Sequence, residues 1–181
     1  MPKYVGLLRA VNLAGTSNLK MDVLAESLRR VGFDRVRTLL RSGNFVFSSR
    51  LTRPEEIELR IETLLAESFG LRTESFVRTP ADWHTVVSEN PFPDEALRDP
   101  GHTTVFVLKS PTAAPAWTAL QESITGSERV RGARTHGYIV YPDGIGTSRL
   151  TTARIERALG TRGTTRNWNT VTKLDALLAQ Q

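Results

Sequence analysis

Apolar and polar positions along the chain follow two periodicities, and the changes between them mark out short strands and helices. In the first half, compact apolar runs bounded by turn residues predict strands. Segments with an apolar residue every three or four positions predict helices. The predicted strands are 4–9, 36–40, 45–47 and 73–78, and the predicted helices are 20–30 and 54–69. Their order is β-α-β-β-α-β, which is typical of the split βαβ or ferredoxin-like arrangement.

The second half repeats most of this order. Its predicted strands are 103–108, 128–131 and 136–141, and its predicted helices are 111–125 and 148–159. A stretch rich in hydrogen-bonding side chains, 164–174, stands where a final strand would come. Trp168 opens an apolar stripe at helical spacing there, which predicts a helix with Arg166 and Asn167 at or just before its N-terminus. We expect Trp168 to be largely buried at the head of that stripe.

These patterns predict an α+β protein of two packed ferredoxin-like (split βαβ) subdomains with an extra C-terminal helix. Residues 1–90 form the first subdomain and a linking helix, and residues 102–181 form the second subdomain with the C-terminal motif and helix. Between them, residues 91–101 hold three of the nine prolines and three acidic residues. That composition is typical of a linker between subdomains.

Composition limits the chemistry that is open to the chain. It contains no cysteine, which excludes disulfides, a thiolate nucleophile and zinc–thiolate sites. No apolar run is long enough to span a bilayer and no signal-peptide pattern is present, so we expect a cytoplasmic protein that does not bind membranes. The three histidines have no metal-ligand spacing and the chain has no nucleotide-binding fingerprint, so we expect no metal and no cofactor.

The net charge of +5 is unevenly distributed. Residues 1–60 hold 11 Lys and Arg against 6 Asp and Glu, and residues 127–173 hold 9 against 3. The segment between them, 61–126, holds 4 against 9. One interpretation is that the segments neutralise one another and keep the protein soluble. The other is a shared basic surface suited to phosphate or nucleic acid.

Three loops carry residue types that bind anions. The loop from Arg9 to Asn18, with Lys20 beyond it, joins a strand to a helix, as in units that present backbone N–H groups to an anion. The turn 41–44 adds an arginine and a serine, and the segment 144–149 places two glycines before hydroxyl groups and an arginine. The same residues also suit a capped helix start, a hairpin turn and an N-cap. For the second and third loops this structural interpretation is the stronger one.

Several short motifs carry a resemblance to a known family. They are Leu7-Leu8-Arg9-Ala10-Val11-Asn12, Ser42-Gly43-Asn44-Phe45-Val46-Phe47, Asn90-Pro91-Phe92, Ser148-Arg149-Leu150 and Thr164-Thr165-Arg166-Asn167-Trp168-Asn169-Thr170. With them the chain resembles the bacterial domain-of-unknown-function family 1697 over almost its whole length. The resemblance implies a compact two-part α+β fold and no established activity, cofactor or partner. Ala10 and Ala14 stand where that family usually has glycine, and a Cβ there hinders close approach of the backbone to a ligand.

The sequence therefore favours a binding module for a phosphorylated or anionic ligand, nucleic acid included, at a basic cleft between the subdomains. The candidate ligand-binding residues are Arg9, Asn12, Lys20, Arg41, Ser42, Asn44, Ser148, Arg149, Thr165, Arg166, Asn167, Asn169 and Lys173. Two alternatives stay open. The motifs can be purely structural, or the protein can be an enzyme that acts on a phosphate or acyl substrate, although no catalytic dyad or triad follows from residue spacing.

Overall fold

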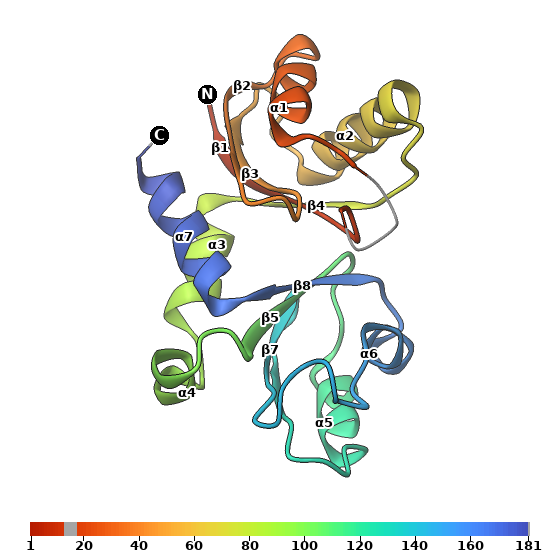
Figure 1. The fold of residues 1–181 in the computed structure, drawn as a ribbon, viewed down its shortest axis with the longest axis vertical. Coiled ribbons are helices and arrows are strands. Elements are labelled where there is room, and N and C mark those ends of the chain that lie inside the picture. Colours follow the sequence, from red (N-terminus) through yellow and green to blue (C-terminus); the bar gives the residue numbers. More distant parts are fainter. Residues whose placement is uncertain (13–17, 181) are drawn as a thin grey trace. The chain divides into compact units, whose positions relative to one another are not determined.

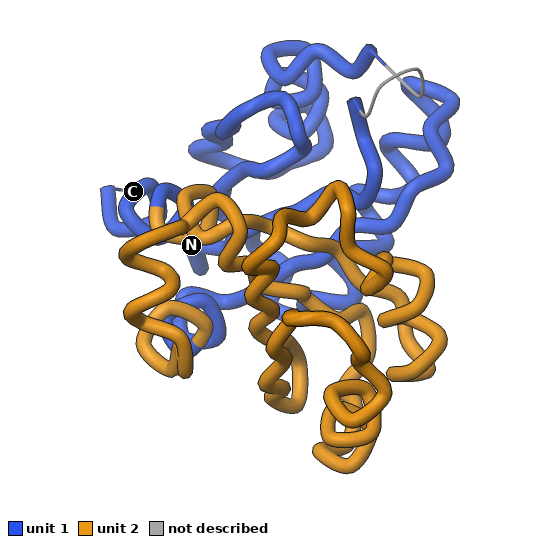
Figure 2. The backbone as a smooth tube through the Cα atoms, turned by 60° about the horizontal axis from the view of Figure 1, so that its bottom comes forward, with its two compact units in different colours: residues 1–85, 173–181 blue, residues 86–172 orange. Residues whose placement is uncertain are grey.

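The structure, a computed structural model, describes residues 1–12 and 18–180. The chain divides into two compact units, coloured separately in Figure 2. Unit 1 comprises residues 1–85 and 173–181, and unit 2 comprises residues 86–172. The boundaries fall inside helices α3 (Pro80–Ser88) and α7 (Trp168–Ala179). The segment predicted as a linker contains helix α4 (Pro93–Arg98) and belongs to unit 2.

Unit 1 is built on a four-stranded sheet in the order β2-β3-β1-β4, with antiparallel neighbours throughout. In chain order its elements are β1 (Lys3–Leu8), α1 (Met21–Arg30), β2 (Asp34–Leu39), β3 (Asn44–Ser48), α2 (Pro54–Phe69) and β4 (Ser75–Arg78). The elements agree in type and order with those that the hydrophobic pattern predicts for the first half.

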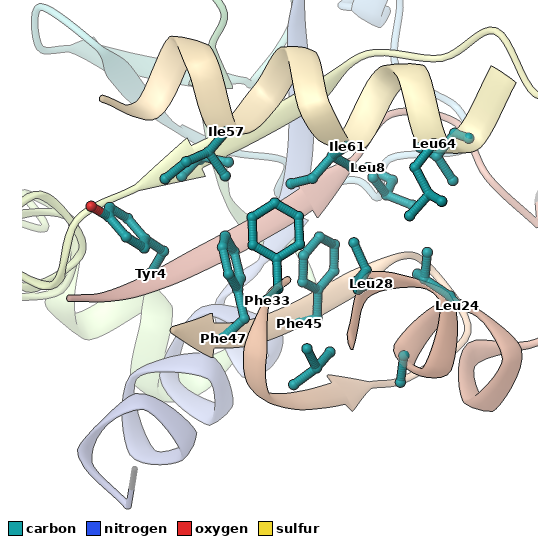
Figure 3. Packing of buried hydrophobic residues seen from close by; sticks show 14 of the residues in the cluster. Tyr4, Leu8, Leu24, Leu28, Phe33, Phe45, Phe47, Ile57, Ile61 and Leu64 are labelled. Atoms are coloured by element: carbon teal, nitrogen blue, oxygen red, sulfur yellow. The ribbon is translucent and has the colours of Figure 1, made fainter. Parts of the chain in front are cut away.

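One face of this sheet packs against α1 and α2 and forms the core of unit 1 (Figures 1 and 3). Helix α2 directs Ile57 and Ile61 at the sheet, because residues four apart lie on one helix face. The rings of Phe45 and Phe47 meet them from β3, with their centroids 5.5 Å apart. Each such buried side chain stabilises the fold by about 1.5–3 kcal/mol.

Unit 2 has its own four-stranded antiparallel sheet, in the order β6-β7-β5-β8. After α4 its elements are β5 (Thr103–Leu108), α5 (Ala114–Glu122), β6 (Arg129–Gly132), β7 (His136–Val140), α6 (Thr152–Leu159) and β8 (Gly163–Asn167). Helices α5 and α6 lie on one face of this sheet (Figure 1). Within the described part of the chain, no helix combines the length and apolar character needed to cross a membrane.

Trp117 of α5 fixes the contact between that helix and the β6–β7 hairpin. Its indole Nε1 donates to the carbonyl of Ala133 at 3.0 Å. A Cβ on Gly132 would lie 1.9 Å from the indole Cγ, and a Cβ on Gly137 would lie 2.2 Å from Cη2. Both positions therefore need glycine, because any side chain would displace the indole from the strands.

The structure corrects the prediction for the C-terminal stretch. Arg166 and Asn167 do lie just before a helix N-terminus, as predicted, but they also belong to a strand, residues 163–167, that pairs with β5 and that the sequence pattern did not predict. Helix α7 begins at Trp168, whose exposure is intermediate, so it is not part of the fully buried core. This polar strand has no apolar alternation, and its backbone pairing with β5 gives it its strand conformation.

The pairing of β1 with the edge strand β4 in unit 1 has the same register as the pairing of β5 with the edge strand β8 in unit 2. The matching pairs are Leu8–Ser75 and Val5–Arg78 in unit 1, and Leu108–Gly163 and Val105–Arg166 in unit 2. The next backbone bond also matches, since Arg9 N donates to Glu74 O and Lys109 N donates to Arg162 O. Arg78 and Arg166 therefore occupy equivalent places in the two sheets.

Carboxylates of α2 satisfy the outward-facing amides of the edge strand β4. Ser75 N donates to Glu62 Oε1 at 2.9 Å, and Val77 N donates to Glu58 Oε1 at 2.8 Å. The guanidinium Nη1 of Arg78 lies 3.9 Å from the same Glu58 oxygen. Burial lowers the pKa of Arg78, and the Glu58 carboxylate opposes that effect. Glu58 thus joins the helix, the sheet edge and a buried cation.

We expect Glu58→Ala to lower the free energy of unfolding by about 3–5 kcal/mol, because it leaves the buried Val77 amide without its acceptor and removes the carboxylate that offsets the burial of the Arg78 guanidinium. Glu56 on the same helix is the matched control: its ion pair is with exposed Arg53, so Glu56→Ala should cost less than about 1 kcal/mol. Urea unfolding of both variants measures the difference. Equal losses would show that Glu58 does not support the edge.

Candidate functional site

Six of the predicted site residues come together in unit 1, around the side chain of Asn12. Its Nδ2 donates to the carbonyls of Leu19 and Arg41, both at 2.7 Å. Its Oδ1 accepts from Leu19 N at 2.7 Å. One amide therefore ties the chain after β1 to the start of α1 and to the β2–β3 turn. We call this arrangement the Asn12 junction.

Asn44 and Gly43 hold the β2–β3 turn in place beside the junction. Asn44 is fully buried, and its Nδ2 donates to Leu39 O at 3.0 Å and to Ser42 Oγ at 2.9 Å. Gly43 has a φ of 74°, and its carbonyl accepts from Leu8 N. A Cβ on Gly43 would lie 2.6 Å from Val11 Cγ2, so a larger residue cannot take its place. These contacts are structural, as the hairpin interpretation of this turn predicts.

Non-glycine residues adopt the left-handed backbone conformation on both loops of the junction. Ala10 has a φ of 51°, Asn12 of 54° and Leu40 of 59°. For alanine and leucine this conformation costs about 1–2 kcal/mol each, and such strain gathers at binding and catalytic sites. Ala10 stands where the family that the chain resembles usually has glycine, which fits its positive φ. Ala14 lies outside the described residues.

The junction brings together side chains of positive charge. Lys20 and Arg41 are exposed, and neither pairs with a carboxylate of the described chain; Arg41 Nη2 reaches only Asn18 Oδ1, at 3.4 Å. Arg9 is half-buried, with Nε 3.9 Å from Glu74 Oε2. Lys20 is also the N-cap residue of α1, and its side chain makes no capping hydrogen bond. The one acidic residue in the first turn of that helix is Asp22.

Ser148 and Arg149 line a separate pocket of about 320 Å³ in unit 2. Ser148 Oγ donates to the carboxylate of Glu128, and Asp143 accepts from Ser127. The two carboxylates in its lining offset its arginines, Arg149 and Arg154. This pocket is therefore less suited to an anion than the Asn12 junction is.

The remaining candidates lie on β8 and α7. Arg166 is buried, and its Nη1 donates to Thr164 Oγ1 at 2.8 Å and to Thr165 O at 2.7 Å. Burial lowers its pKa to about 10. Asn167 Oδ1 accepts from Thr170 N at 3.0 Å and so caps α7. These contacts favour the structural interpretation for Arg166 and Asn167. Exposed residues of α7 complete the set, namely Asn169 and Lys173.

Sequence reasoning missed an imidazole–carboxylate pair in unit 2. His102 Nδ1 lies 2.7 Å from Asp99 Oδ2, and both side chains line a pocket of about 280 Å³ with Arg98 and Arg129. The hydrogen bond from His102 holds the pKa of Asp99 below its usual value. The sequence signal for this pair is that Asp99 and His102 stand three residues apart, on either side of Pro100-Gly101. That spacing brings the two side chains together only because the chain turns there.

Substitutions at Asn12 separate its hydrogen bonds from its backbone conformation. Asn12→Gly keeps the left-handed conformation but loses three hydrogen bonds, so we expect the free energy of unfolding to fall by about 1.5–4.5 kcal/mol. Asn12→Ala should lose about 1–2 kcal/mol more, because alanine resists that conformation. Denaturant unfolding of both variants measures the two effects. An unchanged stability in Asn12→Gly would contradict a clamping role.

Comparison with known proteins gives a family and a fold. The family model described as Protein of unknown function (DUF1697) matches residues 1–138. A solved structure, that of the conserved bacterial protein SP0830 from Streptococcus pneumoniae, is similar, with a TM-score of 0.75 and 19% sequence identity over 99% of each chain. At this identity the likeness concerns the fold alone. No curated protein matches the chain.

The family match covers more than half of the chain and includes the Asn12 junction, with the strands and turns that build it. It therefore confirms the resemblance that the short motifs indicate. The chain belongs to the DUF1697 family.

Proposed function

We propose that the protein is a binding module for a phosphorylated or otherwise anionic ligand, and that the Asn12 junction is its site. One observation carries the proposal: the partly buried side chain of Asn12 joins two loops by hydrogen bonds, and the exposed cations of these loops, Lys20 and Arg41, have no carboxylate partner in the described chain. A structural clamp needs the amide of Asn12 but does not need these charges.

The chemistry of the junction suits a phosphate group. Lysine binds phosphate as a compact positive charge, and arginine adds a planar pair of donors. The first amides of α1 stand beside Lys20 without a side-chain cap from that residue, and a helix N-terminus favours a negative charge. Strain at Ala10 and Leu40 also fits a site whose loops are held in one conformation before a ligand binds.

For each unit we further propose the ferredoxin-like arrangement. The strand orders β2-β3-β1-β4 and β6-β7-β5-β8, each with antiparallel neighbours and two helices on one face, support it. In unit 1 this arrangement brings the end of β1 beside the β2–β3 turn, because β1 and β3 are neighbours. The two loops of the junction therefore meet as a consequence of strand order.

Two binding measurements test the site. Calorimetry measures the binding of inorganic pyrophosphate, and fluorescence anisotropy measures the binding of a labelled single-stranded oligonucleotide. We expect Lys20→Gln and Arg41→Gln each to weaken binding about 10- to 100-fold, because each removes a charge-assisted contact. Arg50→Gln is the matched control: it removes one exposed charge from unit 1 beyond the other end of β3, and should leave affinity unchanged.

The two probes distinguish the ligand class. Tight pyrophosphate binding with weak oligonucleotide binding indicates a small phosphorylated ligand. If the ligand is a nucleic acid, the logarithm of the oligonucleotide affinity falls linearly with the logarithm of the salt concentration. Lys20→Gln should then reduce the steepness of that line by about one. Equal effects of all three substitutions, or no binding of either probe by the unmodified protein, would overturn the proposal.

A second candidate function is an enzyme acting on a phosphate or acyl compound, and the His102–Asp99 pair favours it. Asp99 accepts from Nδ1 and so leaves Nε2 as the proton acceptor of the imidazole. Arg98 and Arg129 line the same pocket and would stabilise negative charge on a substrate, although Glu95 also pairs with both.

Turnover of p-nitrophenyl phosphate and p-nitrophenyl acetate tests this second candidate. If His102 is a general base, His102→Gln should lower the rate by about 100-fold or more, and Asp99→Asn should lower it less. His84→Gln removes another exposed histidine and serves as the control. The same rate in the His102 and His84 variants would rule out catalysis by this pair.

A further inference from the structure

The pocket of about 320 Å³ in unit 2 is lined by two loops that are tied to each other by crossed hydrogen bonds. One loop joins α5 to β6, and the other joins β7 to α6. Ser127 of the first loop donates to Asp143 of the second, and Ser148 of the second donates to Glu128 of the first. Each loop therefore contributes one carboxylate and one serine, and the two bonds hold the walls of the pocket in place.

The two carboxylates keep hydrogen-bonding capacity for a ligand. An ionised carboxylate has two oxygens and about four acceptor sites. Ser148 reaches Glu128 through Oε1, and Ser127 reaches Asp143 through Oδ2. Both acidic residues line the pocket, so a donor inside it can bind the same carboxylates. An ammonium group is well suited to them, because it carries three donors and the opposite charge.

Gly126 leaves the space in which the Glu128 carboxylate lies. A Cβ on Gly126 would lie 2.2 Å from Glu128 Oε2, so a side chain there would displace the carboxylate. The φ of Gly126 lies outside the left-handed region, so this position needs glycine for space and not for backbone conformation. Tyr141 also lines the pocket, and burial, together with the nearby Glu128 carboxylate, raises the pKa of its hydroxyl.

Arg149 supplies positive charge to the same pocket. It is exposed, and within the described chain no ion pair joins it or Arg154 to the two carboxylates. Arg154 donates instead to the carbonyl of Ser123, just after α5. Charges of opposite sign thus line one pocket without pairing directly. A ligand that carries both charges, separated within one small molecule, is complementary to this lining.

We propose that this pocket binds an α-amino acid, with the ammonium group of the ligand at Glu128 and Asp143 and its carboxylate at Arg149. The volume of the pocket lies at the lower end of the range for small-molecule sites. Its two carboxylates and two arginines balance in charge, which matches a ligand of no net charge. The site lies within unit 2, and it goes beyond the function proposed for the Asn12 junction.

NMR of the full chain tests the site. The amide resonance of Ser148 is followed during titration with each common α-amino acid in turn, at constant ionic strength near neutral pH. For the amino acid that binds most tightly, the acid without the amino group and the amine without the carboxylate are titrated as well. Ribose represents a neutral polyol. We expect a saturable shift with the amino acid and at least about tenfold weaker binding of either analogue, because each lacks one charge-assisted contact.

Substitutions distinguish the two ends of the ligand. Glu128→Gln keeps an acceptor for Ser148, and we expect it to weaken the amino acid and the amine analogue at least about tenfold without affecting the acid analogue. Arg149→Gln should weaken the amino acid and the acid analogue instead. Glu122→Gln and Arg157→Gln remove the same charges from exposed positions outside the lining, so these matched controls should keep the affinity of the unmodified protein.

Gly126→Ala tests the position of the Glu128 carboxylate without changing its charge. It should weaken amino-acid binding as Glu128→Gln does, with urea unfolding to confirm that the variant is folded. Lys20→Gln should leave the titration unchanged, which separates this site from the function proposed for unit 1. The inference would be overturned by the absence of a saturable shift with any amino acid, by equal binding of a single-charge analogue, by tighter binding of ribose, or by equal affinity in the pocket variants and their controls.

Discussion

Helix carboxylates that accept hydrogen bonds from sheet-edge amides fix how the helices lie against their sheets. A buried N–H group without an acceptor costs about 1–3 kcal/mol, so an edge strand beneath a helix needs a partner there. Glu58 and Glu62 supply it on β4, and Glu156 supplies it on β8. The same carboxylates cover strand edges that could otherwise pair with another chain.

Comparison of the two units shows the same constraint met in the same place. Their sheets share strand order and register. Glu62 of α2 accepts from the Ser75 amide in unit 1, and Glu156 of α6 accepts from the Gly163 amide at the equivalent place in unit 2. A glutamate on the second helix of each unit therefore ties that helix to the edge strand of its own sheet.

At the Asn12 junction, structural and functional roles fall on different residues. The side-chain amides of Asn12 and Asn44 account for the shape of two loops, and that role is complete without a ligand. The exposed cations Lys20 and Arg41 contribute nothing comparable to stability, because exposed charges are well solvated. Conservative substitutions at the two kinds of residue should therefore affect different measurements, stability for the amides and affinity for the cations.

The sequence by itself determined the elements whose residues repeat with a clear period. Helix α2, with Ile57 and Ile61 four residues apart, and the apolar strands β1 and β5 follow from local pattern, because burial of one face requires it. Tertiary structure alone decided β8, whose residues Gly163–Asn167 are polar and become a strand by pairing with β5. It also decided that Asn12 meets Arg41 and that Asp99 meets His102. Those outcomes depend on strand order, register and chain turns, which join residues that no sequence period relates.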